Sequence, residues 1–139
     1  MTTRLNPYIT FGGNAREAME FYQTVFGGEL ELNTWGEQPD MPGNNPDMHD
    51  KLLHSMLTVD HAIALMGADM PDSPGPKGAP ISVSLSGDDE ARLRGWWDKL
   101  SEGAEIRAPF ETAPWGDTYG ECIDTFGVRW MVNVAGTQG

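Results

Sequence analysis

Apolar residues follow first a strand pattern and then a helix pattern at the start of the chain. Residues 5–11 alternate in polarity and end at two glycines, which predicts a strand followed by a turn. Asn14 stands at the expected N-cap of a helix, with Glu17 three positions later, as in a capping box. Apolar residues then recur at helical spacing until a second glycine pair ends the helix: Ala15, Ala18, Met19, Tyr22, Val25 and Phe26.

The rest of the first half has the pattern of three strands. Residues 29–35 predict a strand, and residues 36–50, which contain three prolines, predict a loop. Residues 52–59 and 62–66 then predict two strands joined as a hairpin. Residues 68–79 are rich in proline, glycine and aspartate, so we expect a connector there.

After the connector the same order of patterns begins again. Residues 80–86 alternate strictly, and the acidic residues 88–90 favour the start of a helix. Leu93, Trp96, Trp97 and Leu100 form its apolar stripe, and the Trp96-Trp97 pair is expected to be core plus edge or a dimer contact rather than a stacking platform. Gly103 ends the helix, and three more strands are predicted at residues 105–110, 118–123 and 129–134.

Two successive units of strand, helix and three strands predict an α+β fold made of paired βαβββ modules. We expect a single domain over residues 1–139, with modules at about residues 4–67 and 80–135. One helix covers one face of each sheet, so the paired modules are expected to form a cupped, eight-stranded mixed sheet with the helices on the convex face. The concave groove of this sheet is the expected place of function.

Charge and cysteine content limit the classes of partner. The 139 residues carry a formal charge of −12, which disfavours binding to nucleic acid and to anionic membranes because their charges share its sign. Cys122 is the single cysteine, so no intrachain disulfide forms and a cytoplasmic location is expected. No run of residues is long and apolar enough to predict a membrane span.

Three passages carry a resemblance to a known family: Pro7-Tyr8-Ile9 leading to Ala18-Met19-Glu20-Phe21-Tyr22 and Val25-Phe26-Gly27-Gly28; His54; and Trp115-Gly116-Asp117, Tyr119-Gly120, Asp124, Phe126-Gly127 and Trp130. The chain resembles the vicinal oxygen chelate superfamily of glyoxalases, bleomycin-resistance proteins and extradiol dioxygenases. It is most similar to the PhnB-like branch, often labelled 3-demethylubiquinone methyltransferase-like. The resemblance implies paired βαβββ modules, a homodimer and a small-molecule ligand.

The resemblance also implies where metal-dependent relatives hold a divalent ion. Those positions fall near Pro7 or Tyr8, Ile81 or Ser82, Leu65, and Met131. Thioethers, hydroxyls and hydrocarbons do not suit a hard ion, so we expect no cofactor and regard a divalent metal as disfavoured. The glycine-rich turn of a parallel sheet that methyltransferases need is absent from the sequence pattern, and the methyltransferase label is therefore not supported.

His54 and Glu121 are the two candidates for chemistry. Alternation places His54 with Met56, away from the helix, where it serves as a ligand, a general base or a substrate partner, or else as a structural histidine. Glu121 shares a strand face with Tyr119 and is either a carboxylate of the groove or the surface partner of Arg129. Both alternatives stay open for each residue.

The other expected ligand-binding residues line the same concavity: Tyr8, Thr10, Ser82, Ser84, Trp115, Tyr119 and Asn133. His49 and His61 are expected to be exposed and idle, and Cys122 to be a buried apolar residue. The leading hypothesis is a glyoxalase-like protein that binds a small organic molecule without a complete metal site. The alternative is a lyase, isomerase or dioxygenase with a divergent site at His54 and Glu121, so catalysis stays an open question.

Overall fold

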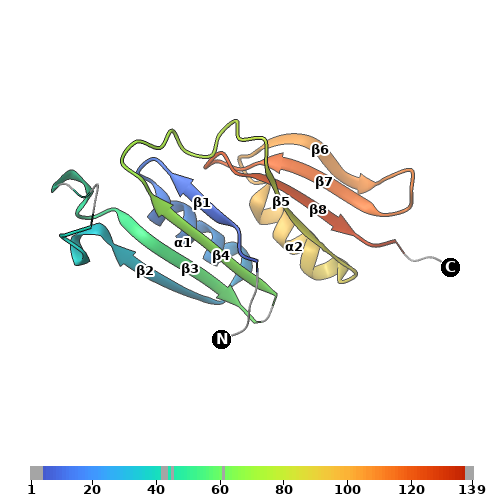
Figure 1. Ribbon diagram of the computed structural model, residues 1–139. Coiled ribbons are helices and arrows are strands. Elements are labelled where there is room, and N and C mark those ends of the chain that lie inside the picture. The colour runs from blue at the N-terminus through green and yellow to red at the C-terminus, as the bar shows by residue number, and fades with distance from the viewer. Residues whose placement is uncertain (1–4, 42–43, 45, 61, 137–139) are drawn as a thin grey trace. The chain divides into compact units, whose positions relative to one another are not determined.

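The computed structural model describes residues 5–41, 44, 46–60 and 62–136, and the chain divides into two compact units, residues 1–76 and 77–139. The first unit contains β1 (Tyr8–Phe11), α1 (Ala15–Phe26), β2 (Glu29–Thr34), β3 (Leu52–Val59) and β4 (Ile63–Asp69), with short 3₁₀ helices η1 (Trp35–Glu37) and η2 (Pro46–Met48). The second contains β5 (Ser82–Gly87), α2 (Glu90–Leu100), β6 (Glu105–Thr112), β7 (Thr118–Ile123) and β8 (Arg129–Val134) (Figure 1). The α+β class and the repeated βαβββ order are confirmed.

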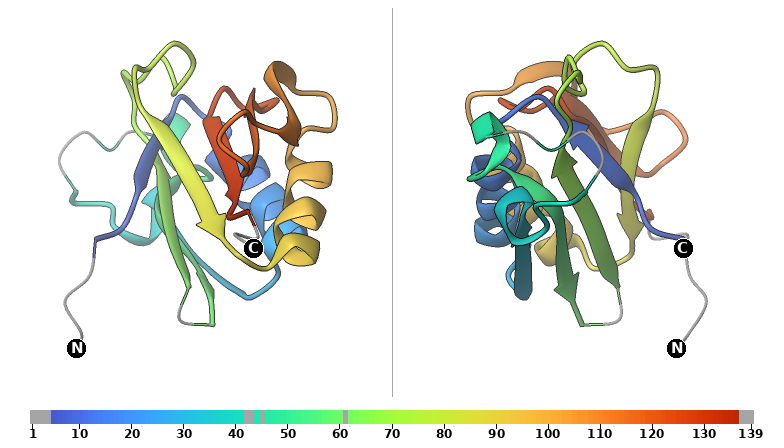
Figure 2. Two further views of the ribbon diagram at one scale, coloured as in Figure 1. Left: turned by 90° about the vertical axis from the view of Figure 1, so that its right-hand side faces the viewer. Right: turned by 60° about the vertical axis from the view of Figure 1, so that its left-hand side comes forward.

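In the first unit a four-stranded sheet has the order β1-β4-β3-β2. β1 runs parallel to β4, whereas the β3 pairings with β2 and β4 are antiparallel. Helix α1 covers one face of this sheet (Figure 2), and its buried residues are those that the helical spacing predicted. A Cβ on Gly67 would lie 3.0 Å from the Met19 sulfur and 3.1 Å from the Phe11 ring, so the glycine lets the helix pack closely on β4.

The N-terminus of α1 is capped from another element than predicted. The Asn14 side chain makes no capping hydrogen bond. Instead, Asp69 at the end of β4 accepts the amides of Gly13 at 2.8 Å and Ala15 at 3.0 Å with one carboxylate oxygen, and the amide of Leu52 at 3.1 Å with the other. A carboxylate suits the positive end of a helix, so the capping box predicted at Asn14 is wrong and a long-range contact replaces it.

A bulge changes the phase of β3. The alternation that places His54 away from the helix would put Leu53, Leu57 and Val59 beneath it, but only Leu57 and Val59 are buried. Adjacent residues of β2 pair with Leu52 and His54, which leaves Leu53 as the extra residue of a β-bulge. Leu52 is fully buried in its place. His54 keeps its predicted face because the bulge lies before it.

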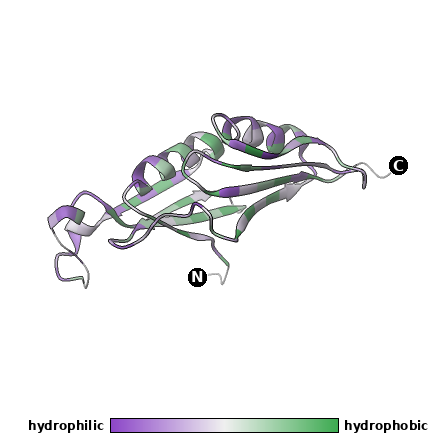
Figure 3. Cartoon of the chain, turned by 90° about the horizontal axis from the view of Figure 1, so that it is seen from above, coloured by the Kyte–Doolittle hydropathy of each residue, from purple (hydrophilic) through white to green (hydrophobic). Residues whose placement is uncertain are grey.

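The second unit repeats the arrangement with the strand order β5-β8-β7-β6. Helix α2 covers one face, where Trp97 is buried and stacks on Phe110 with ring centroids 5.3 Å apart. A Cβ on Gly120 would lie 2.9 Å from the Trp97 ring, so this face of β7 is filled by the helix. Both helices carry hydrophilic and hydrophobic stretches, as amphipathic helices do (Figure 3).

The predicted irregular segments contain short structure of their own. Trp35 belongs to η1 rather than to the preceding strand, and its indole N–H donates to the Asp69 carbonyl at 2.9 Å. Strand β4 extends three residues further than the predicted end at Met66. None of the described helices has the length and apolar character needed to cross a membrane. His61 lies outside the described residues.

Candidate functional site

Strand alternation divides the second sheet into a helix-covered face and a helix-free face. Gly120 meets Trp97 of α2 and Cys122 is fully buried, so the residues between and beside them point the other way. Pairing of β7 with β8 and of β8 with β5 then carries this phase across the sheet. The helix-free face receives most of the site residues predicted in this half: Ser82, Ser84, Tyr119, Glu121 and Asn133.

Tyr119 and Glu121 are hydrogen-bonded on this face. The phenol oxygen of Tyr119 donates to Glu121 Oε1 at 3.3 Å. Burial raises the pKa of Tyr119 above its usual value, and the neighbouring Glu121 carboxylate raises it further, because both disfavour the phenolate. The pair therefore presents a neutral phenol beside a carboxylate with free acceptor capacity.

The alternative prediction paired Glu121 with Arg129 at the surface, and the strand register separates the two residues. Glu121 pairs across the ladder with Met131, whereas Arg129 stands opposite Ile123. Within the described ranges, no ion pair joins Glu121 to Arg129. The carboxylate's hydrogen-bond partner in the structure is Tyr119.

Trp115 lies in the turn between β6 and β7, beside Tyr119. The two ring centroids are 6.1 Å apart with the planes tilted by 59°. The indole is 60% exposed, which is unusual for so large an apolar group. Trp115, Tyr119 and Glu121 thus form an aromatic and acidic cluster, hereafter the Trp115 cluster.

Asp117 holds in place Asn133, the residue of β8 that pairs with Tyr119. Its carboxylate accepts the side-chain amide of Asn133 at 3.1 Å and the backbone amide of Gly136 at 2.8 Å. The Gly136 amide, and after it the Asn133 amide, lowers the pKa of Asp117, because both hydrogen bonds favour the ionised form. The sequence analysis did not assign this role, since residues 16 positions apart give no local spacing signal.

In the first unit, Tyr8 and His54 lie on the helix-free face of the sheet. Their ring centroids are 5.9 Å apart, with the planes tilted by 33°. Tyr8 is 45% exposed, and partial burial raises the pKa of its phenol. Thr10 shares the face by alternation and is half-buried, as is His54. The structure therefore groups the three residues predicted from this half on one surface.

Two other predicted placements concern single residues. Cys122 is fully buried, and burial with the nearby Asp124 and Glu121 carboxylates raises the pKa of its thiol to about 12. A thiol with this pKa is protonated at neutral pH and unreactive. His49 is exposed in the loop after β2, as predicted.

A family model described as Glyoxalase/Bleomycin resistance protein/Dioxygenase superfamily matches residues 4–132. The chain belongs to this superfamily. Protein YjdN of Escherichia coli K12 is 32% identical over 145 residues, which cover 96% of this chain and 97% of YjdN. Protein PA1353 of Pseudomonas aeruginosa has a similar crystal structure, with 35% identity, a TM-score of 0.81, and coverage of 96% and 98%.

The solved structure of a PhnB protein is also similar to this chain. The putative 3-demethylubiquinone-9 3-methyltransferase, PhnB protein, from Bacillus cereus covers 96% of this chain and 100% of its own, at 20% identity and a TM-score of 0.72. At this identity the likeness shows the fold alone. The superfamily resemblance predicted from the three sequence passages is confirmed.

The side chains at the positions where the resemblance places metal ligands do not suit a divalent ion. Leu65 is buried and apolar, Met131 offers a thioether, and the neighbouring positions offer the phenol of Tyr8 and the hydroxyl of Ser82. Within the part of the chain that the structure describes, no three His, Cys, Asp or Glu side chains are grouped to hold a metal. The function proposed below therefore uses no metal-dependent step.

Proposed function

We propose that this superfamily member binds a small organic molecule at the helix-free face of its sheet and releases it unchanged. The Trp115 cluster carries the proposal. An indole that is 60% exposed beside a hydrogen-bonded phenol and carboxylate provides an apolar ring surface and acceptor atoms within one small area.

The residues around the cluster support binding rather than bond-breaking. The hydrogen bond to Asp117 fixes the side-chain amide of Asn133. The side-chain oxygen of Asn133 is therefore held in one orientation, ready to accept a hydrogen bond from a ligand. The raised pKa of Tyr119 keeps its phenol protonated at neutral pH, where it donates to Glu121 and does not act as a base. In the first unit, three residues on the helix-free face of the sheet offer further ligand contacts. These are the phenol ring of Tyr8, the hydroxyl of Thr10 and the imidazole of His54.

The proposal includes an assembly and a setting. We expect a homodimer, because Ile81 and Ile106 of the second unit are 73% and 47% exposed and gain from being covered. We expect no nucleic-acid or membrane partner, given the charge of −12. A cytoplasmic location is proposed from the single cysteine.

The test is a screen of small organic molecules with ¹⁵N-labelled protein, observing the indole N–H of Trp115 and the side-chain amide of Asn133. We expect bound compounds to shift these signals in a saturable way and to be recovered chemically unchanged. Replacing Trp115 by Ala should weaken binding about tenfold, because a ring contact of about 1.4 kcal/mol is lost. Met70→Ala is the control, since Met70 is 37% exposed and follows the end of β4, outside the Trp115 cluster and the proposed dimer contacts.

Two results would overturn the proposal. One is that the protein converts a bound compound to product, and that the rate of this conversion falls by orders of magnitude in His54→Ala. Such a loss of rate is the signature of a catalytic group. The other is a set of ligands that bind equally well to the wild-type protein and to Trp115→Ala. Each result is read on the same protein samples, with circular dichroism confirming that the variants are folded.

A further inference from the structure

Three carboxylates lie around the rings of the Trp115 cluster, each from a different part of the second unit. In β6, Glu111 is exposed and stands opposite Tyr119 in the strand ladder, so the two share the helix-free face. In β7, Glu121 accepts the hydrogen bond of the Tyr119 phenol. In the turn before β7, Asp117 lies two positions after the exposed indole.

The Asp117 carboxylate is held in its ionised form beside the indole. Hydrogen bonds from the backbone amide of Gly136, and then from the side-chain amide of Asn133, lower the pKa of Asp117, whereas desolvation opposes them. A hydrogen bond from the Trp115 side chain lowers this pKa further. Because the N–H on the ring edge is the only donor of an indole, the edge is turned toward Asp117. The face of this ring, which is 60% exposed, remains for a ligand.

Two arginines of the same sheet bear on the charge around these rings. Arg129 pairs in the ladder with the residue four positions beyond Tyr119, which is about 13 Å further along the strand. Arg107 lies at the β6 bulge and is ion-paired with Glu105 at 3.3 Å. Across the residues that the structure describes, no ion pair joins either arginine to the three carboxylates. The surroundings of the rings are therefore negatively charged.

We propose that the Trp115 cluster, acting as in the proposed function on which this step rests, binds an organic cation: an ammonium group with alkyl substituents. The face of an exposed indole attracts such an ion through the ring quadrupole, and the alkyl groups pack on the ring carbons. The surrounding carboxylates attract the same charge and repel an anion. A neutral molecule of equal shape gains neither electrostatic attraction.

Three probes of similar shape separate charge from fit: choline, neohexanol and the anion of tert-butylacetic acid. Neohexanol is choline with carbon in place of nitrogen, and the third probe carries the same tert-butyl group beside a carboxylate. The indole N–H signal of Trp115 is followed in ¹⁵N-labelled protein. We expect saturable shifts with choline, binding about tenfold weaker with neohexanol, and no binding of the anion. Added salt should weaken the binding of choline and leave that of neohexanol unchanged.

Variants test the ring and the charge separately, with the Asn133 side-chain amide as the observed signal. Trp115→Ala should weaken choline binding about tenfold, because the ring face is lost. Glu121→Gln removes one charge and keeps the shape, so it should weaken choline binding about threefold and leave neohexanol binding unchanged. Glu20→Gln is the matched control, because it makes the same change of net charge at an exposed position of α1 in the first unit. It should leave choline binding unaltered.

The preference for a cation is wrong if choline gives no saturable shift, or if neohexanol binds as tightly as choline. It is also wrong if added salt and Glu121→Gln both leave choline binding unchanged. The proposed function survives these results as long as the compounds that do bind are weakened by Trp115→Ala. Failure of the proposed function differs, because compounds then bind equally well to the wild-type protein and to Trp115→Ala.

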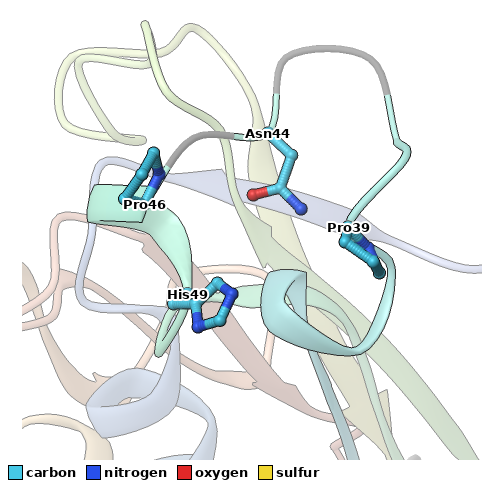
Figure 4. A pocket seen from close by; sticks show the side chains of 4 residues that line it. All are labelled: Pro39, Asn44, Pro46 and His49. Atoms are coloured by element: carbon cyan, nitrogen blue, oxygen red, sulfur yellow. The ribbon is translucent and has the colours of Figure 1, made fainter.

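A cavity elsewhere in the chain gives the last outcome. It has a volume of about 480 Å³, lies in the loop between β2 and β3, and is lined by Pro39, Asn44, Pro46 and His49 (Figure 4). Choline that shifted the His49 signals and left those of Trp115 in place would be bound there. This result would overturn the assignment of a cation to the Trp115 cluster.

Discussion

The phenol of Tyr119 donates a hydrogen bond to the carboxylate of Glu121, two positions further along the same strand. Neighbours at this spacing lie on one face of a sheet, so the pair depends only on the regularity of β7. It brings an ionisable phenol and a carboxylate together beside the exposed ring of Trp115. The predictions below begin with this pair.

Replacing Glu121 by Gln should lower the pKa of Tyr119 toward its usual value. The change removes the negative charge that disfavours the phenolate and leaves only the effect of burial. Titration of ¹³Cζ-labelled tyrosine by NMR separates Tyr119 from the other two tyrosines. Glu105→Gln is the control, because Glu105 is exposed and is paired with Arg107. An unchanged Tyr119 pKa in Glu121→Gln would show that the pair is not coupled.

The Cys122 thiol should resist modification in the native protein. With a pKa of about 12 and no exposed surface, it is neither ionised nor accessible at neutral pH. A disulfide reagent at pH 8 should label it only after denaturation. Its folded pKa lies above the ordinary value of 9.0, so its stability contribution is complete below about pH 9. That contribution is lost as pH rises toward 12. Rapid labelling of folded protein would contradict the burial.

Asp69→Ala should destabilise the first unit by about 3 kcal/mol or more. Three backbone amides that the carboxylate accepts would be left buried without a partner. Urea unfolding measures the loss as a lower midpoint. Asp72→Ala is the matched control, because Asp72 is exposed and should change the free energy of unfolding little. Equal midpoints for the two variants would show that another group caps α1.

Asn133→Ala should raise the pKa of Asp117. It removes one of the hydrogen bonds that favour the ionised carboxylate and leaves the Gly136 amide in place. The Asp117 pKa in the wild-type protein lies below its ordinary value of 3.8, so the contribution to stability is present above pH 3.8 and is lost as pH falls further. A carboxyl-detected NMR titration follows the shift. Ser84→Ala, which is exposed on another strand, should leave it unaltered.

Local patterns predicted the elements well but not the contacts between distant segments. The strands at residues 52–59, 118–123 and 129–134 have the predicted bounds, because alternation and flanking turns are local signals. The cap on α1 was missed because Asp69 lies 54 positions from Ala15. The bulge at Leu53 was missed because it depends on pairing with β2 and not on the apolar pattern of β3 itself.

The candidate site was predictable to the extent that it follows strand phase. Alternation alone placed Tyr119 with Glu121 and His54 on the face away from α1. It did not reveal that Asp117 fixes Asn133, nor that His49 lines a cavity with Asn44. Both depend on turns and loops, where side-chain direction is set by tertiary contacts rather than by a regular period.

The metal content of protein purified without chelator tests the central claim most directly. Gel-filtered protein would be analysed for zinc, nickel, manganese and iron by mass spectrometry, before and after incubation with each ion. A binder that lacks the superfamily's ligand set should retain far less than one ion per chain. One tightly held ion per chain, lost when His54 and Glu121 are replaced, would contradict the account and favour a metal-dependent enzyme.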